Sequence, residues 1–599
     1  MTMHRRRALS LLALGAAGPT AALANPRQSS SQAASFIHGV ASGDPWPDSV
    51  LLWTRATPAD PEARSLTVDW ELAADAAFTH VVARGAVQTG RERDFTVKAL
   101  ARGLAPSRDY HYRFRCGAVT SPAGRTRTLP AGPTPDAVLA FVTCSLYPGG
   151  YFNVYDHIAR LERVDAVVCL GDYIYEYGAA DDDYGMEHGR KLGRIPEPPH
   201  EIITLADYRT RHALYKRDRD LQAAHARAPW IVVWDDHEVA NDTWVGGAEN
   251  HQPKTEGLWL KREAAALRAY YEWMPIREPE PGRAFEAINR SFQFGDLASL
   301  IMVETRLVAR SWQLEYGRPG DLPLAVYDSA DPAIRTRVEE PDVVRQAMAA
   351  AQAGQAPPAP YVLGPDPQAL NAIITNPERQ MLGARQEQWL AREIASSVNA
   401  GRPWQVLGNQ VVMARTRAPD IRRAIGPQRL AQLLAAIPES SRAAAARTIN
   451  LFTFDVPFDL DGWDGYPAAR ERMFDAIKIA QGNAIIVSGD SHAFWANELH
   501  DAEGAYVAAE FGTSSVTSPS PGDELPGVDL GRIFMDQCPE VSFCDQHAKG
   551  YVKLTLTRGE AHAELIAMPV TTKPYQAAVL ATFRLTPAPG PAPSRLEKL

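Results

Sequence analysis

Side chains that could bind a metal or move a proton follow several apolar runs of this sequence. In "VDAVVCLGDYIYEYG", residues 164–178, an apolar run leads into Asp172, Tyr175 and Glu176. Taken alone, this pattern is more simply a strand that surfaces, with solvated acids and aromatic residues at the sheet edge. The same pattern recurs, however, in three other segments. They are "FVTCS" with Cys144, "WDDHEVAND" with Asp236, His237 and Asn241, and "SGDSH" with Asp490 and His492.

Side chains that follow neighbouring strands of an α/β sheet gather at one edge of that sheet. The repeated placement of potential ligands therefore predicts one shared metal site. None of the spacings matches a zinc finger or an EF-hand loop. Tyr173 and Tyr177, which flank Tyr175, are assigned to packing.

Simpler interpretations stay open for single members of this set. Asp235 or Asp236 could form a capping pair with Glu238 at the start of a helix, which is the commoner role of such a cluster. Asn241 could face solvent one turn further on. His492 could be a hydrogen-bonding group beside the metal and not a ligand.

The first 24 residues differ from the rest of the chain. Arg5, Arg6 and Arg7 precede the apolar "ALSLLALGAAG", and Ala22-Leu23-Ala24 resembles a cleavage site. This pattern predicts an export signal, and the apolar segment is too short to span a bilayer. The adjacent arginines favour the twin-arginine export machinery, with general secretion as the alternative.

Composition limits the class of protein. The sequence has 599 residues, of which 45% are hydrophobic and 22% charged, so we expect a globular protein with more than one domain and no transmembrane segment. Loss of residues 1–24 removes three of 62 basic residues and none of 71 acidic ones, which leaves a formal charge of −12. A stable nucleic-acid complex is therefore not expected. Five cysteines are few for an exported chain, although Cys538 and Cys544 could pair.

The elements that position the candidate residues divide along the chain. Residues 25–35 read as a polar linker, and residues 36–131 contain short alternating segments typical of a β-sandwich. Within them, "LAPSRDY" (residues 104–110) resembles the tyrosine corner of immunoglobulin-like domains. The cluster "LPAGPTPDA" at residues 129–137 marks the boundary of this domain.

Beyond that boundary, apolar runs alternate with helical stretches, which predicts an α/β domain over residues 132–575. Residues 309–368, which contain "AQAGQAPPAP", read as an insertion. The final residues, 576–599, read as a flexible tail because they end in "TPAPGPAPSRLEKL".

The joint set of motifs resembles the alkaline phosphatase D family of secreted metallophosphoesterases. The resemblance begins at "FIHGVASGDPWPDSVLLWTR" and continues through the four segments above to "LGARQEQWL", "FDLDGWDGYPAARERM" and "EFGTSSVTSPS". It implies an N-terminal β-sandwich followed by a metallophosphoesterase domain of two packed mixed sheets flanked by helices. One departure is Glu304 in "ETR", where the family usually has aspartate.

The resemblance also implies a site that holds ferric iron and calcium. The residues fit that division, because a thiolate, a phenolate, an imidazole and a carboxylate suit Fe(III), whereas ligands that offer oxygen alone suit Ca²⁺. Tyrosine three residues after the bridging aspartate is similar to the arrangement in purple acid phosphatases. The expected iron ligands are Cys144, Asp172, Tyr175 and His492, and the expected calcium ligands are Asp172, Asp236, Asn241 and Asp490.

The activity implied is hydrolysis of phosphate mono- or diesters by a metal-bound hydroxide, with Asp172 bridging the two metals. His237 is expected to stabilise the transition state or to protonate the leaving oxygen. Small phosphate esters or phospholipid head groups would be the substrates, the latter in a phospholipase D-like reaction, and the periplasm or the extracellular space the location.

A different class of protein also fits part of the pattern. In a secreted binding protein, the sandwich would recognise a polymer and the acids would hold a structural calcium ion. That interpretation leaves Cys144 and His492 without a role, because calcium has little use for thiolate or imidazole. The sequence therefore favours the enzyme.

Overall fold

The computed structural model describes residues 33–599, apart from positions 182, 317, 319, 332–333, 354, 438, 526 and 591. The predicted export signal and residues 25–32 of the predicted linker lie outside the described residues. The last residues of that linker are part of the fold, because β1 (Ala34–Ser35) pairs with β4 (Thr57–Pro58).

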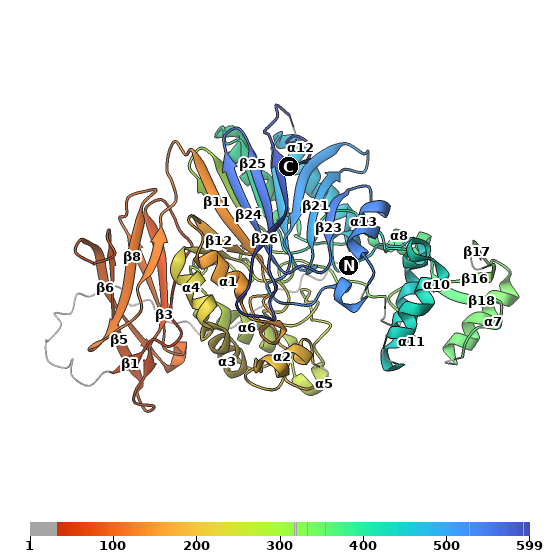
Figure 1. Ribbon diagram of the computed structural model, residues 1–599, viewed down its shortest axis with the longest axis horizontal. Coiled ribbons are helices and arrows are strands. Elements are labelled where there is room, and N and C mark those ends of the chain that lie inside the picture. The colour runs from red at the N-terminus through yellow and green to blue at the C-terminus, as the bar shows by residue number, and fades with distance from the viewer. Residues whose placement is uncertain are drawn as a thin grey trace, which may run out of the picture.

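Alternating apolar residues build the N-terminal β-sandwich, at the left of Figure 1. One of its sheets contains β5 (Ser65–Ala73), β6 (Val81–Gly90), β8 (Asp109–Cys116), β9 (Val119–Thr120) and β10 (Gly124–Arg127). The facing strands are β2 (Val40–Gly43), β3 (Ser49–Arg55) and β7 (Thr96–Arg102). In β8, every second side chain is buried, and Tyr112 and Phe114 pack in the core between these layers.

The predicted tyrosine corner is present in this sandwich. The hydroxyl oxygen of Tyr110 accepts a hydrogen bond of 3.0 Å from the backbone N–H of Ala105. The bond fixes the loop that leads into β8, as the motif "LAPSRDY" predicted.

The sandwich is joined to the following domain by a shared sheet. Gly43 of β2 pairs in parallel with Trp230 of β13 (Trp230–Val232), so that the order of the sheet is β27-β26-β25-β24-β11-β12-β13-β2-β3-β7. A side chain at Gly43 would lie 2.0 Å from the carbonyl oxygen of Pro275, so this close approach requires glycine. The chain crosses a boundary near residue 131, but the sheet does not end there.

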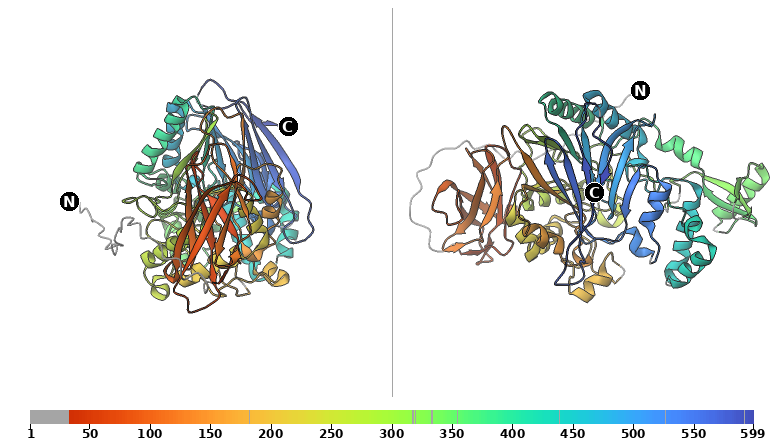
Figure 2. Two further views of the ribbon diagram at one scale, coloured as in Figure 1. Left: turned by 90° about the vertical axis from the view of Figure 1, so that its left-hand side faces the viewer. Right: turned by 45° about the horizontal axis from the view of Figure 1, so that its top comes forward.

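Two packed sheets form the larger domain, with helices outside them (Figures 1 and 2). In the first sheet, the strands of this domain are β11 (Asp136–Val142), β12 (Ala166–Cys169), β13, β24 (Gly550–Thr557), β25 (Ala561–Ala567), β26 (Ala578–Leu585) and β27 (Glu597–Lys598). The second sheet has the order β14 (Arg290–Phe294), β15 (Ala298–Met302), β19 (Trp404–Gly408), β20 (Ala484–Ser488), β22 (Tyr506–Gly512), β21 (Phe494–His500) and β23 (Val541–Asp545).

Both sheets contribute to one hydrophobic core, which includes Phe141 and Val168 from the first sheet and Val406 and Val487 from the second. The longer helices near the sheets are α1 (Asn153–Ala159), α3 (Leu205–Lys216), α4 (Arg219–Arg227), α6 (Trp259–Trp273), α9 (Ala384–Asn399), α12 (Pro467–Ala480) and α13 (Leu530–Gln537). Strands β11, β12 and β13 run parallel, as do β15, β19, β20 and β22.

The predicted flexible tail is wrong where residues 578–585 and 597–598 form strands β26 and β27. Strand β26 pairs along its whole length with β25, and Phe583 and Leu585 are buried in the core. The segment "AVLATFRL" alternates apolar residues toward the sheet, a pattern that the Pro-rich residues after it obscured.

The predicted insertion is a structured projection at the right of Figure 1. It contains a three-stranded sheet and two helices: β16 (Leu324–Asp331), β17 (Ile334–Arg337), β18 (Tyr361–Pro365), α7 (Pro341–Gln352) and α8 (Pro367–Ile374). A second projection, which sequence reasoning missed, consists of α10 (Ile421–Ala436) and α11 (Glu439–Leu451). The segment that follows α11 meets the insertion where Phe454 contacts Tyr327, with ring centroids 4.9 Å apart.

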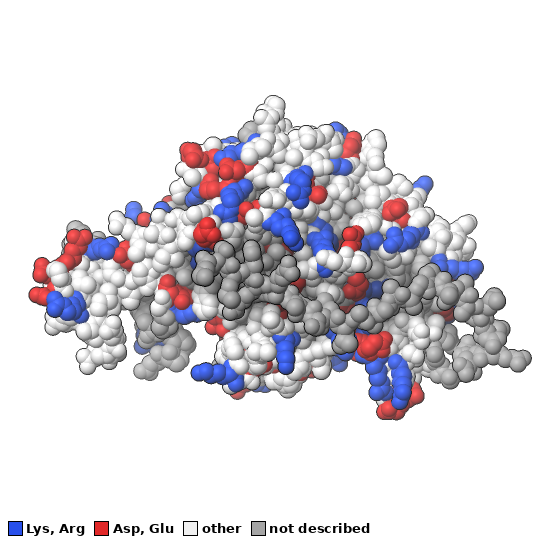
Figure 3. All heavy atoms as spheres, turned by 180° about the vertical axis from the view of Figure 1, so that it is seen from behind, with Lys and Arg blue, Asp and Glu red and all other residues white. Residues whose placement is uncertain are grey.

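Surface and covalent features agree with the composition. All five cysteines are buried free thiols, so Cys538 and Cys544 do not pair. On the face seen in Figure 3, acidic and basic side chains are interspersed over the described residues. Within the described part of the chain, no helix combines the length and apolarity needed to cross a bilayer.

Candidate metal centre

The candidate residues converge at the carboxyl ends of strands from both sheets. Cys144 follows β11, Asp172 follows β12, Asp235 and Asp236 follow β13, and Asp490 and His492 follow β20. Cys144, Asp172, Asp490 and His492 all have left-handed backbone conformations, with φ between 53° and 61°. Such conformations are costly for residues other than glycine, and their repetition here indicates that the loops are constrained to aim side chains at one point.

One group of donors is chemically mixed. Single ligand atoms of Cys144, Asp172 and His492 lie within 4.8 Å of one another, and all three side chains are largely buried. The hydroxyl of Tyr175 lies 3.0 Å from Oδ2 of Asp172 and 3.3 Å from Nε2 of His492. The structure therefore places these four predicted iron ligands together.

The imidazole of His492 is oriented for binding through Nε2. Its Nδ1 lies 2.6 Å from the carbonyl oxygen of Pro519, so that Nδ1 carries the proton and donates it. Burial and, to a lesser degree, the charge of Lys549 lower the pKa of His492 to about 3. The ring is therefore neutral, with the lone pair of Nε2 directed toward Tyr175.

The thiol and the phenol of this group are both protonated in the protein without metal. Burial raises the pKa of Cys144 and of Tyr175, and the negative charge of Asp172 adds to the effect on both groups. Ser518 donates a 2.7 Å hydrogen bond to the Tyr175 hydroxyl. A bound cation would reverse this preference and favour thiolate and phenolate.

A second group consists of carboxylates. Oxygen atoms of Asp172, Asp235, Asp236 and Asp490 lie within 4.8 Å of one another. Asp172 belongs to both groups, as a bridging ligand would. No helix begins at this loop, so the capping interpretation of Asp235 and Asp236 is wrong.

Glu238 instead connects the loop after β12 with the loop after β13 through hydrogen bonds. Its Oε2 accepts hydrogen bonds from the backbone N–H groups of Asp172 (3.0 Å) and Asp235 (2.8 Å), and its Oε1 accepts one from Tyr173 (2.7 Å). Burial raises the pKa of Glu238 to about 8. This residue holds the loops after β12 and β13 in a fixed relation.

Arg306 was missed by the sequence analysis, and it lies among the carboxylates. The buried guanidinium forms an ion pair with Asp235, and its Nη2 is 3.3 Å from Oδ1 of Asp490. Its Nη1 is 2.6 Å from Oδ2 of Asp461. Glu304 positions this loop, because its carboxylate accepts the backbone N–H of Arg306 at 2.8 Å.

His237 is paired with Glu176, another residue that the prediction had not assigned. Nδ1 of His237 lies 2.7 Å from Oε2 of Glu176, and the ring lies 4.1 Å from that of Tyr175, measured between centroids. Burial disfavours the charged imidazole, but the negative charges of Glu176, Asp236 and Asp172 raise the pKa of His237 well above its usual value.

Asn241 and Tyr173 make their hydrogen bonds to other residues. Asn241 donates from Nδ2 to Glu249 at 3.3 Å and from its backbone N–H to Glu176 at 2.7 Å, and its role as a calcium ligand stays a prediction. The hydroxyl of Tyr173 is 2.9 Å from Nε2 of His225 in the core, as expected of a packing residue.

Two stacked sheets whose parallel strands end in one buried cluster of acids, thiol and imidazole define an α/β enzyme of the metallophosphoesterase type. The PhoD-like phosphatase family matches residues 139–565, and the N-terminal domain of PhoD-like phosphatases matches residues 21–130. The chain therefore belongs to the PhoD-like phosphatase family, as the motifs predicted, and it is a phosphoester hydrolase.

Individual relatives agree with this assignment. The chain is 33% identical over 555 residues to alkaline phosphatase D of Bacillus subtilis (strain 168), which covers 90% of this chain and 78% of that protein. A solved structure of PhoD matches with a TM-score of 0.71 and 32% identity, covering 96% of this chain and 93% of the other. The predicted fold class is thereby confirmed.

Proposed function

We propose that the enzyme hydrolyses phosphate mono- or diesters at this centre with the help of ferric iron and calcium. Cys144, Asp172, Tyr175 and His492 would hold iron. Asp172, Asp236, Asn241 and Asp490 would hold calcium, with Asp235 as an added candidate. The observation that carries the proposal is the position of Asp172, which lies in both groups of donors.

The donor chemistry fits the two metals. One group combines sulfur, nitrogen and phenolic oxygen with Asp172, which suits a transition metal, and the other consists of carboxylates, which suit a hard cation. When bound, such cations activate water and neutralise charge on phosphoryl oxygens.

Residues of the chain itself contribute charge and protons. Arg306 is buried and fixed by several carboxylates, so it offsets their mutual repulsion and keeps their spacing. His237 is held as an imidazolium by Glu176, which makes its Nε2 proton available to a phosphoryl oxygen or to the leaving oxygen.

The test is metal analysis of the purified protein combined with hydrolysis of p-nitrophenyl phosphate and bis-p-nitrophenyl phosphate near pH 8. We expect iron and calcium to be bound and at least one ester to be cleaved, with loss of activity on chelation. A preparation that holds both metals but cleaves neither ester would contradict the proposal. Calcium without iron would favour the secreted binding protein.

We also propose export of the folded protein to the periplasm or beyond by the twin-arginine machinery. The proposal rests on Arg5, Arg6 and Arg7 before a short apolar run. Replacement of all three by lysine should leave unprocessed protein inside the cell. Unchanged export in that strain, or normal export in cells without the machinery, would refute this route.

A further inference from the structure

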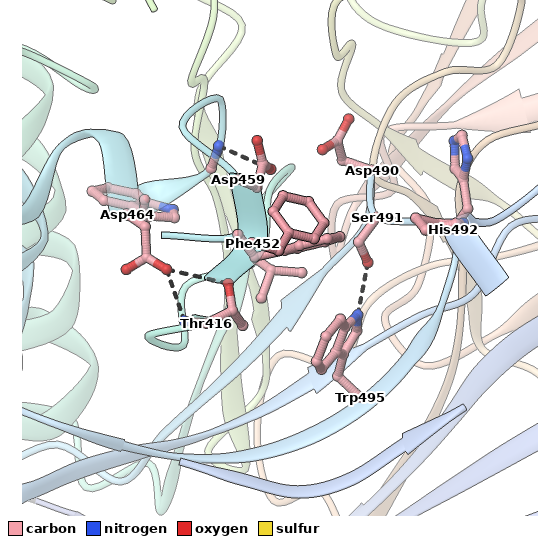
Figure 4. Close-up of a pocket in the computed structure, with 13 residues that line it drawn as sticks. Thr416, Phe452, Asp459, Asp464, Asp490, Ser491, His492 and Trp495 are labelled. Carbon is pink, nitrogen blue, oxygen red and sulfur yellow. Dashed lines mark hydrogen bonds between the residues drawn. The ribbon is translucent and has the colours of Figure 1, made fainter. Parts of the chain in front are cut away.

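A cavity of about 360 Å³ lies beside the candidate metal centre and shares Asp490 and His492 with it (Figure 4). Its volume is within the range of small-molecule sites. The described lining residues include four aromatic rings and three aspartates but neither lysine nor arginine. A phosphate group would find no cationic side chain among these lining residues. Aromatic rings and carboxylates instead suit an organic group that is apolar or positively charged.

The aromatic side chains that line the cavity pack against one another and against Phe534. The rings of Phe452 and Phe458 meet edge to face with centroids 5.7 Å apart, and Phe534 lies behind, 4.9 Å from Phe458 and 5.0 Å from Trp495. Trp495 is fixed by a hydrogen bond of 2.8 Å from its Nε1 to the hydroxyl of Ser491. Figure 4 shows this hydrogen bond between Trp495 and Ser491, with Phe452 between Asp464 and His492.

The carboxylates of the cavity are not equivalent. Asp464 is neutralised by Arg470, whose Nη1 lies 2.7 Å from Oδ1. Asp459 accepts backbone N–H groups of Asp461 (2.8 Å) and Gly462 (3.1 Å), but no described lysine, arginine or histidine lies within 4.0 Å of its carboxylate. Burial raises the pKa of Asp459 to about 6, so at pH 8 the carboxylate still offers a negative charge to the cavity.

We propose that this cavity receives the organic group of the phosphate ester and that Phe452, Phe458, Trp495 and Asp459 select a cationic, alkylammonium-type group. The inference rests on the proposed function, because it places the phosphate at the adjacent centre. Aromatic faces attract a desolvated organic cation, and a carboxylate adds to that attraction. An anionic group would be repelled by Asp459, which has no ion-pair partner among the described residues.

The segment after α11 forms one wall of this cavity, and the insertion packs behind that segment. Phe452 and Phe458 belong to the segment after α11, and Phe454 between them packs on Tyr327 of the insertion. Residue 364 of β18 has to be glycine for Phe454 to pack there, because a side chain at that position would lie 2.2 Å from the Phe454 ring. The insertion thus supports the wall that would determine specificity.

Three monoesters of similar size test the preference: choline phosphate, its neutral analogue 3,3-dimethylbutyl phosphate, and anionic 3-carboxypropyl phosphate. With the metal-loaded enzyme at pH 8, we expect kcat/KM to be about tenfold higher for choline phosphate than for the neutral analogue, and lowest for the anion.

Two variants test the residues of the cavity. Phe458→Leu keeps apolar bulk but removes the ring, and Asp459→Asn removes the charge. Each should bring the ratio of kcat/KM for choline phosphate to that for the neutral analogue close to one. Asp455→Asn is the matched control, because Asp455 is exposed four residues from Asp459 and outside the lining, and it should keep the ratio.

Binding of choline itself, measured by calorimetry, separates the two proposals. Hydrolysis of all three esters without charge preference in the wild type, or a preference that survives both variants, would overturn the cavity inference and leave the phosphoesterase standing. Choline binding that is weakened in Phe458→Leu and Asp459→Asn but kept in Asp455→Asn would support the cavity inference even if no ester were cleaved.

Discussion

The carboxylate of Glu176 lies 2.7 Å from Nδ1 of His237, and both side chains are buried. Asn250 and the backbone of Asn241 donate hydrogen bonds of 2.9 Å and 2.7 Å to the other oxygen of Glu176. These contacts fix the carboxylate, which in turn fixes the ring and its charge. His237 is therefore a positively charged group at a centre of negative carboxylates.

Glu176→Gln should move the alkaline limb of the pH–activity profile to lower pH. The amide keeps the shape but removes the charge that raises the pKa of His237, so the imidazolium is lost earlier as pH rises. The measurement is kcat/KM between pH 7 and 10 for the wild type and the variant. Glu249→Gln, which removes an exposed carboxylate nearby, is the control, and an unshifted limb in Glu176→Gln would mean that the His237 proton is not used.

Tyr175→Phe should remove a visible absorption band from the iron-loaded protein. A phenolate bound to Fe(III) gives a charge-transfer band, and the Tyr175 hydroxyl is the one phenol placed beside both Asp172 and His492 among the described residues. Tyr173→Phe should leave the band in place, because that hydroxyl contacts His225 in the core. A full band in Tyr175→Phe with iron still bound would refute the ligand assignment.

His212→Phe should make the free energy of unfolding fall less between pH 8 and pH 5 than it does in the wild type. The ring of His212 is buried between Tyr173 and Trp273, and neither of its nitrogens has a hydrogen-bond partner among the described residues. Burial, with the charges of Lys216 and Arg211, lowers its pKa to about 3, whereas the unfolded chain has a value of about 6.5.

Between those two values the unfolded state binds more protons, so the contribution of His212 to stability falls as pH falls. From pH 8 to pH 5 the loss is about 2 kcal/mol. Urea unfolding at pH 8 and pH 5 gives the change for each protein, and we expect that change to be smaller by this amount in His212→Phe. Equal changes in both proteins would contradict the assignment.

A chain ending at Tyr575 should be strongly destabilised. It lacks β26, which supplies the buried Phe583 and Leu585 and covers the edge of β25. Loss of these two side chains alone costs about 3–6 kcal/mol, and the exposed edge promotes aggregation. Thermal unfolding and soluble yield are the measurements. A chain ending at Leu585 keeps the strand and should be affected much less, and equal behaviour of the two truncations would show that β26 adds little.

The sequence predicted most of the site because rare side chains follow apolar runs. Cys144, Asp172 and His492 each stand just after a strand, and strands of one sheet bring such positions together. Arg306 also follows a strand, β15, but its partners come from β13 and β20 and from the loop at Asp461, a long-range arrangement that local pattern does not reveal. Glu176 was visible as an acid in the first motif, yet its partner His237 lies on another loop.

The limits of local sequence pattern also explain the errors in the prediction of the fold. Pro-rich residues after Leu585 hid a strand whose own alternation was regular. The helices at 421–451 were missed because they lie outside the layered domain and few of their described residues are buried. The sandwich was predicted from residues close in the chain, whereas the pairing of β2 with β13 joins positions nearly 190 residues apart.

The pairing of β2 with β13 ties the N-terminal domain to the larger domain, although the two are consecutive and separate in the sequence. Asp44, directly after β2, accepts the backbone N–H of Arg277 at 2.7 Å and lies 2.9 Å from Nη2 of Arg290, so polar contacts reinforce the join. The two halves should melt in a single cooperative transition. An exchange of the sandwich for another domain would succeed only if the newcomer supplied an edge strand with a small residue opposite Trp230.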